Sequence, residues 1–289
     1  MFVPFFLQKF LKSYNILHIT TTLSFYNLFM AIKYVVTSGK GGVGKTTLTA
    51  NIGLKLAESG KRVAVVDGDL GLNNLDVLTG VENKSVFDLS DVVSGKCRAK
   101  QALVESPLNK NLFVLPSAHT LTSPEISGQG IKSAINSIEG LFDYIFIDCP
   151  AGIDLGFHRA VSCADRAIVV VTPTITSVRD ADKVISILKS YTLSGIEVLV
   201  NRIRGDLVLS GKSLSEMDIE NTLKVEVLGV IPDDDALSAI TFGGFLGDSG
   251  KAIKSVSLKI MGKKSRPYDY LKKYTGFWGS IRKELKRRL

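Results

Sequence analysis

Residues 38–47, SGKGGVGKTT, have the residue types and the spacing of a loop that binds the phosphate groups of a nucleotide. Residues 39–46 match the pattern G-x-x-x-x-G-K-[ST], between an apolar run and an amphipathic stretch. The glycines allow backbone N–H groups to turn toward the phosphates, and the positive end of the following helix adds to the attraction. We expect Lys45 to reach the β- and γ-phosphates of ATP, and the Thr46 hydroxyl to bind Mg²⁺. The residues assigned to nucleotide binding in this loop are Gly39, Lys40, Gly41, Gly42, Val43, Gly44, Lys45, Thr46 and Thr47.

Three carboxylates follow apolar runs in the sequence: Asp67 ends VAVVD, Asp69 lies two residues later, and Asp148 ends YIFID. In an open α/β sheet, residues at the carboxyl ends of strands face the ligand crevice. We expect Asp67 and Asp148 to join Thr46 at a magnesium ion, and Asp69 to position or polarise the attacking water. A turn-capping role for Asp67 and a solvated position for Asp69 are the alternatives. The backbone N–H of Gly152, in CPAG, is expected to sense the γ-phosphate.

The elements that must position these residues alternate along the chain from residue 32. Short apolar runs predict strands at 32–37, 63–67, 112–115, 144–148, 167–172, 197–201 and 225–231. Amphipathic stretches predict helices at 45–59, 130–139, 155–163, 177–192, 213–222 and 250–261, and Gly60 is placed to end the first of them. Continuously apolar strands are typical of a sheet that is buried on both faces. The predicted fold is therefore an α/β P-loop NTPase, a mostly parallel twisted sheet with helices on both faces, plus a C-terminal amphipathic helix.

The charge of the chain is concentrated at its C-terminal end. The 289 residues carry a net charge of +8, but residues 259–289 alone hold 11 Lys and Arg against 2 acidic residues, so the remainder is nearly neutral. This distribution argues against a nucleic-acid-binding body, and nucleic acid is not an expected partner. The three cysteines form no CxxC or Cys/His cluster, which favours a reducing compartment; Cys149 and Cys163 are interpreted as small buried residues.

Residues 276–289 have the pattern of an amphipathic helix that lies in a membrane surface. Phe277, Ile281, Leu285 and Leu289 recur every fourth residue, with Trp278 beside the first. The basic side chains that occupy the other faces include Arg282, Lys283 and Lys286. Such a helix binds anionic lipids through both its apolar and its basic side chains. A helix packed on the chain's own body and a nucleic-acid patch are the alternatives.

The chain divides into four segments by composition. Residues 1–29 are rich in aromatic residues but lack a helical period and the roughly 20 apolar residues of a membrane span. We interpret them as a non-native or disordered extension, with Met30 as the true start. Residues 30–262 form the predicted ATPase domain, residues 263–275 a basic linker containing Pro267, and residues 276–289 the membrane-targeting helix.

Several of these motifs together resemble the MinD/ParA class of deviant Walker A ATPases. The resemblance rests on Lys40 together with Lys45, and on VVDGDLGLNNLDVLTG, DYIFIDCPAGID, AIVVVTPTITSVRDADKVI and VLGVIPDD, and it extends from about residue 30 to the C-terminus. It implies that Lys40 crosses a homodimer interface to the phosphates bound by the other subunit, and contributes to catalysis. It also implies adenine contacts from Asn201, Arg202, Pro232 and Asp233. Asn73 and Thr174 depart from the arginine and glutamate that are usual in the class.

The resemblance further implies a slow, partner-stimulated ATPase that places the cell-division site. Its ATP-bound dimer would associate with the inner face of the cell membrane, and its ADP-bound form would be cytoplasmic. The implied partners are a MinC-type inhibitor of FtsZ assembly and a MinE- or DivIVA-type topological factor. A switch controlling flagellar number and a ParA-type DNA-partitioning ATPase are the alternatives within the class. An iron–sulfur carrier would need a C-terminal CxxC, which this sequence lacks.

Overall fold

The computed structural model describes residues 30–69, 74–82, 84–117, 127–233 and 247–275. Eight strands form one sheet in the order β3-β4-β2-β5-β1-β6-β7-β8, and all neighbours are parallel except β3 and β4. The strands are β1 (Ile32–Thr37), β2 (Val63–Asp67), β3 (Val104–Glu105), β4 (Leu112–Leu115), β5 (Tyr144–Asp148), β6 (Arg166–Val171), β7 (Gly195–Ile203) and β8 (Val227–Pro232). This arrangement confirms the predicted α/β fold with a mostly parallel sheet.

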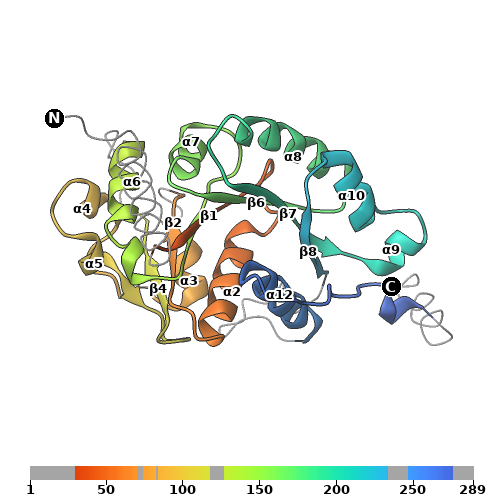
Figure 1. Ribbon diagram of the computed structural model, residues 1–289, viewed down its shortest axis with the longest axis horizontal. Helices are drawn as coiled ribbons and strands as arrows, with labels where there is room; N and C mark the ends of the chain where they lie inside the picture. The colour runs from red at the N-terminus through yellow and green to blue at the C-terminus, as the bar shows by residue number, and fades with distance from the viewer. Residues whose placement is uncertain (1–29, 70–73, 83, 118–126, 234–246, 276–289) are drawn as a thin grey trace, which may run out of the picture.

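Helices cover both faces of the sheet, as Figure 1 shows. One layer contains α2 (Lys45–Glu58), α3 (Asn74–Thr79) and α12 (Gly247–Ile260). The other contains α4 (Leu89–Val93), α5 (Ala99–Ala102), α6 (Gly128–Asn136), α7 (Leu155–Val161), α8 (Ile175–Leu188) and α10 (Glu216–Leu223). The remaining short elements are α9 (Gly205–Leu209) and the 3₁₀ turns η1 (Glu139–Leu141) and η2 (Lys272–Tyr274).

The core divides into two layers because successive strand residues point to opposite faces of the sheet. In β1, Tyr34 and Val36 pack against the layer of α2 and α12, whereas Val35 packs against the layer of α7 and α8. All three side chains are buried, which explains why the sequence of these three residues is continuously apolar.

None of the helices in the described part of the chain has the length and hydrophobicity of a transmembrane span.

The predicted long elements are confirmed, with small shifts at their ends. Helix α2 ends at Glu58, and Gly60 follows with φ of 84°, the left-handed conformation expected of a glycine after a helix. Strand β6 begins and ends one residue before the predicted range. The prediction missed α3, α4, α5, α9 and β3, which have two to six residues each and are too short to show a hydrophobic period.

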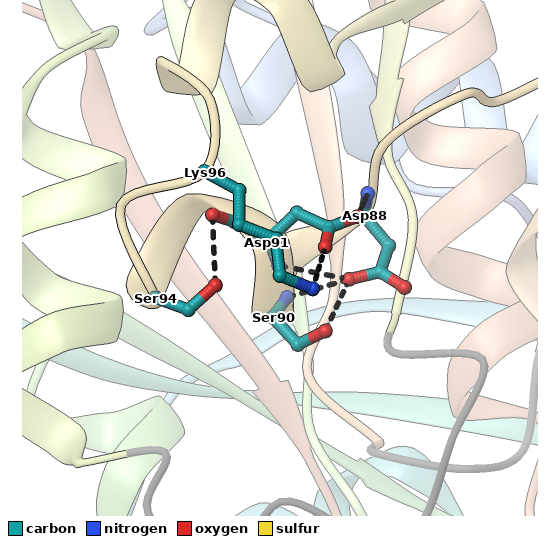
Figure 2. Close-up of polar contacts among 5 residues, drawn as sticks. All are labelled: Asp88, Ser90, Asp91, Ser94 and Lys96. Carbon is teal, nitrogen blue, oxygen red and sulfur yellow. Dashed lines mark hydrogen bonds and ion pairs between the residues drawn. The ribbon is translucent and has the colours of Figure 1, made fainter.

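Helix α4 shows how such a short helix forms without a long amphipathic pattern. The Asp88 carboxylate accepts hydrogen bonds from the backbone N–H groups of Ser90 and Asp91, and Asp91 accepts one from the Asp88 N–H (Figure 2). Lys96 then pairs with Asp91 at 2.9 Å. This reciprocal cap satisfies the free N–H groups at the start of the helix, so five residues suffice.

Candidate nucleotide-binding site

The phosphate loop connects the buried end of β1 to the first turn of α2. Gly42 and Gly44 have φ of 76° and 97°, which are left-handed conformations that favour glycine. Helix α2 begins at Lys45 without a capping side chain, because Gly44 is its N-cap. The N–H groups at this end are therefore available to an anion, as the sequence predicted.

Position 39 needs a residue without a side chain, because helix α8 packs directly against the loop there. A Cβ atom built on Gly39 would lie 2.5 Å from the backbone carbonyl oxygen of Asp180. Gly39 belongs to the predicted phosphate-binding residues, and the approach of α8 is a second reason why it has no side chain.

We expect Gly39→Ala to weaken ATP binding about tenfold or more, because overpacking at this contact displaces either the loop or α8. The same displacement should destabilise the fold by about 1–3 kcal/mol. Titration with a fluorescent ATP analogue and urea unfolding measure the two effects. Gly140→Ala is the matched control, because a Cβ at Gly140 meets no atom within 4 Å and should change neither quantity. Unchanged ATP affinity in Gly39→Ala would contradict the role given to this contact.

The predicted magnesium ligands lie together at the carboxyl ends of two adjacent strands. Asp67 in β2 and Asp148 in β5 are register partners, and each is only 2% exposed. The Thr46 hydroxyl donates to one Asp148 carboxylate oxygen at 2.6 Å, and the Thr49 hydroxyl donates to the other at 3.2 Å. Thr49 was missed from sequence, although it follows Thr46 by three residues and so shares its face of α2.

The electrostatics of this pair suit a divalent cation. Burial, and then the negative charge of Asp148, raise the pKa of Asp67 to about 8. Burial also raises the pKa of Asp148 to about 6, although the hydrogen bond from Thr46 and the positive charge of Lys45 act in the opposite direction. Ionising two buried neighbouring carboxyl groups is costly. The ionisation of both becomes favourable when a bound cation neutralises their charge. Among the described residues no cluster of three or more His, Cys, Asp or Glu forms a metal site. Mg²⁺ needs none here, since it commonly takes one or two carboxylates plus waters and substrate phosphates.

Asp69 lies next to this pair but in a more open environment. Its carboxyl group is half-buried, and its backbone N–H donates to Asp67 at 3.0 Å. The hydroxyl of Ser117, just after β4, donates to the Asp69 carbonyl oxygen at 2.9 Å. Burial raises the pKa of the Asp69 carboxyl, and the positive charge of Lys45 opposes that rise. The backbone of Asp69 is therefore held in place while its carboxylate keeps access to the site.

A cavity of about 410 Å³ opens beside the phosphate loop. It is lined by Gly42, Gly44, Lys45, Thr46, Thr47, Asn74, Val77, Leu78 and Arg202. Helix α3 supplies three of these side chains, none of which was predicted from sequence. They belong to the segment NNLDVLTG, which was recognised as a motif but whose six-residue helix gave no periodic signal.

The predicted adenine contacts lie at the carboxyl ends of the neighbouring strands β7 and β8. Asn201 is buried and donates from Nδ2 to the Val43 carbonyl oxygen at 2.7 Å, while its Oδ1 has no partner in the described part of the chain. Arg202 has φ of 58°, a strained conformation for an arginine, and lines the cavity. Pro232 ends β8 opposite Ile203, and the next N–H, from Asp233, donates to the Ile203 carbonyl at 2.9 Å.

The two lysines of the loop have different surroundings. Lys45 is 9% exposed and lines the cavity. Lys40 is exposed and is not among the residues that line the cavity. Its carbonyl oxygen accepts a hydrogen bond from the Ser38 hydroxyl at 2.7 Å, but its side chain makes no ion pair with another described residue. The structure of one chain thus places Lys45 at the cavity and Lys40 away from it.

The segment after β5 contacts the loop from a second side. The Gly152 N–H donates to the Ser38 carbonyl oxygen over a long 3.4 Å, and Gly152 has φ of 95°. Thr174, a departure from the usual glutamate, caps α8 by accepting from the Ser177 N–H at 3.3 Å.

Cys149 and Cys163 are confirmed as buried free cysteines. The predicted membrane residues Phe277, Trp278, Ile281, Arg282, Lys283, Leu285 and Lys286, and also Asn73, lie outside the described residues.

Comparison with known proteins agrees with this geometry. A family described as an AAA domain matches residues 32–194. A putative septum site-determining protein MinD of Guillardia theta is 44% identical over 215 residues, which cover 74% of this chain and 80% of that protein. A chain of the MinC:MinD cell division protein complex of Aquifex aeolicus superposes with a TM-score of 0.77 at 39% identity, covering 83% of this chain and 99% of that one. The MinD of Pyrococcus horikoshii OT3, solved with Mg-ADP, has a TM-score of 0.72 at 30% identity and covers 80% of this chain and 96% of that one.

Proposed function

Because the chain belongs to the MinD family of septum site-determining proteins, we propose that it is an ATP-driven dimeric switch that places the division site. It is an ATPase that converts ATP and water to ADP and phosphate, with Mg²⁺ as cofactor. The observation that carries the proposal is the combination of a phosphate loop bearing two lysines with the part-buried hydrogen bond of Thr46 to Asp148. The first supports a site that a second subunit completes, and the second supports a magnesium site.

Each residue of the site has one task in the proposed reaction. Thr46, Asp67 and Asp148 would hold Mg²⁺, which supplies charge neutralisation at the phosphate oxygens. Lys45 would bind the β- and γ-phosphates together with the loop N–H groups, and Asp69 would orient the attacking water through its half-buried carboxylate. Asn201, Arg202, Pro232 and Asp233 would contact the adenine base. The Asn201 Oδ1, which has no partner among the described residues, suits an N–H donor such as the exocyclic amine.

The exposed position of Lys40 supports a role across a dimer interface. Three large apolar side chains are also exposed on segments that touch the loop: Ile153 is 49%, Leu155 72% and Ile175 76% exposed. The first two follow Gly152, which is bonded to Ser38, and the third begins α8, which packs on Gly39. Exposed apolar side chains around a functional site favour an interface. ATP would bring two such faces together, with Lys40 of each subunit at the phosphates of the other.

The dimer would act at the membrane and recruit a partner. Two copies of the predicted C-terminal helix, with Phe277, Trp278 and Ile281 on its apolar face, would bind a bilayer far more tightly than one copy. The Aquifex aeolicus relative is known in a complex with MinC, which supports a MinC-type inhibitor of FtsZ assembly as the partner. Hydrolysis, accelerated by a MinE- or DivIVA-type factor, would return the protein to the cytoplasm. The order of events would be binding of ATP, dimerisation, membrane binding and release.

The test is sedimentation with anionic vesicles in ATP, in ADP and without nucleotide. We expect the wild type to sediment only with ATP, and Asp69→Ala to remain bound because hydrolysis falls about 100-fold or more while ATP binding is kept. Phosphate release measures the rate, and Ile281→Glu is the control that removes vesicle binding without changing hydrolysis in solution. If the amount of wild-type protein that sediments depends neither on the nucleotide nor on anionic lipid, the proposal is contradicted.

A further inference from the structure

A run of basic side chains lies on the body of the protein, next to the point where the predicted membrane helix begins. Residues 247–275 carry eight Lys and Arg against two Asp. Four of these cations form what we call the basic ridge, Lys254, Lys263, Lys264 and Arg266, at the C-terminal half of α12 and in the segment that follows it. All four side chains are exposed, and none makes an ion pair with another described residue.

A reversal of the chain brings Arg266 back beside the helix that carries Lys254. Helix α12 ends at Ile260, and Gly262 turns the chain with φ of 69°. The Lys263 N–H donates back to the Leu258 carbonyl oxygen at 2.9 Å. The returning segment then lies along the helix, because the Ser255 hydroxyl donates to the Arg266 carbonyl oxygen at 2.8 Å. Arg266 is therefore held next to the helical turn that carries Lys254.

The two acidic residues of this region do not neutralise the ridge. Asp248, at the start of α12, pairs with Lys251 and Lys273. Asp269 accepts hydrogen bonds from the backbone N–H groups of Leu271 and Lys272, each at 3.0 Å. The positive charge of the ridge is thus left for an external partner.

The chain between the ridge and residue 276 is fixed to the body. A Cβ atom on Gly205, at the start of α9, would lie 2.4 Å from the Tyr270 carbonyl oxygen and 2.8 Å from the Tyr274 ring. The Lys273 ion pair to Asp248 ties the same segment to α12. The segment that precedes the predicted membrane helix is therefore held at a set place on the body, and that helix is predicted to begin ten residues after Arg266.

We propose that the basic ridge, Lys254, Lys263, Lys264 and Arg266, is a second membrane contact that binds anionic lipid headgroups when the C-terminal helix inserts. This inference rests on the proposed membrane association and adds a contact made by the folded body. Continuity with the predicted helix favours a bilayer as the occupant, because that helix is predicted to begin only ten residues after Arg266. Each Lys or Arg held near an anionic surface strengthens binding about fivefold.

The test compares two triple variants of the full chain in ATP, on phosphatidylcholine vesicles with increasing fractions of phosphatidylglycerol. Lys263→Gln/Lys264→Gln/Arg266→Gln should lower vesicle partitioning about 10- to 100-fold and should need more anionic lipid for the same binding. The matched control is Lys100→Gln/Lys132→Gln/Lys189→Gln, which neutralises three exposed lysines over the opposite helix layer and should bind like the wild type. ATP hydrolysis without vesicles should be the same in all three proteins.

Each result separates this inference from the proposed function. If the wild type itself does not bind anionic vesicles in ATP, the proposed membrane association fails. If the wild type binds and the ridge variant binds equally well, the ridge inference alone is overturned. If the ridge variant keeps vesicle binding but loses binding to a fluorescent duplex DNA, the ridge is a nucleic-acid surface and the inference is likewise wrong.

Discussion

Lys40→Ala is expected to abolish ATP-dependent dimerisation and vesicle binding while the monomer keeps its ATP affinity within about threefold. The reason is the difference between the two lysines of the loop: Lys45 is buried at the cavity, and Lys40 is exposed away from it. A cation that reaches the phosphates of the other subunit stabilises charge only in the dimer, so its loss should also lower hydrolysis about 1,000-fold. Light scattering after size-exclusion chromatography, in a non-hydrolysable ATP analogue, measures the mass of the complex.

Lys45→Ala is the matched control for that experiment. It removes a side chain that lines the cavity, so it should lose ATP binding in the monomer and, as a consequence, dimerisation. The two variants therefore distinguish a lysine that binds the nucleotide of its own subunit from a lysine that contacts the nucleotide of the other subunit. A Lys40→Ala protein that dimerises normally in the analogue would exclude the crossing of Lys40 between subunits.

The second large effect is expected at the magnesium site. Asp148→Asn keeps the shape of the side chain and an oxygen acceptor for the Thr46 hydroxyl, but it removes the negative charge that a cation needs. Hydrolysis should fall about 100-fold, and the increase in melting temperature that Mg²⁺ with nucleotide gives the wild type should largely disappear. Phosphate release and differential scanning fluorimetry, with and without a chelator, measure the two effects.

The nucleotide-free form gives an independent check on the same variant. Asp67 and Asp148 are buried neighbours, and the negative charge of Asp148 contributes to the raised pKa of Asp67. Without Mg²⁺ the neutral amide of the Asp148→Asn variant should relieve this repulsion, so its melting temperature should be no lower than that of the wild type. Glu82→Gln, at an exposed residue that forms no ion pair with another described residue, is the control that changes neither reading. A lower melting temperature together with normal hydrolysis would mean that Asp148 is structural and that Mg²⁺ binds elsewhere.

The cavity and the segment that precedes the predicted membrane helix both lie near the end of β7. Arg202 lines the nucleotide cavity, and three residues later Gly205 packs against Tyr270 and Tyr274, which precede the predicted membrane helix. The chain around the end of β7 therefore contacts the cavity at Arg202 and, at Gly205, the residues that precede the predicted membrane helix.

Most of the fold and of the phosphate site was predictable from sequence because the signals are local. The loop pattern, the glycines and the strand that precedes them lie within about 15 residues, and buried parallel strands read directly as apolar runs. Asp67 and Asp148 were placed correctly at strand ends, with Asp69 two residues after the first, because parallel strands all present the same end to the ligand crevice. Asp67 and Asp148 are far apart in sequence, yet their pairing follows from that one rule.

What the tertiary structure alone decided depends on contacts between distant segments. No local sequence pattern predicts three features of the site: the packing of Asp180 on Gly39, the position of α3 along the cavity, and the contact of Asn201 with Val43. Each joins segments that come together only when the whole sheet and its helices pack. The same holds for the basic ridge: composition shows many lysines near residue 260, but only the reversal at Gly262 sets Lys254 beside Arg266. Local sequence determines which residues bind phosphate and which segments form strands, whereas the folded chain determines which side chains share one surface, because that depends on how the layers pack.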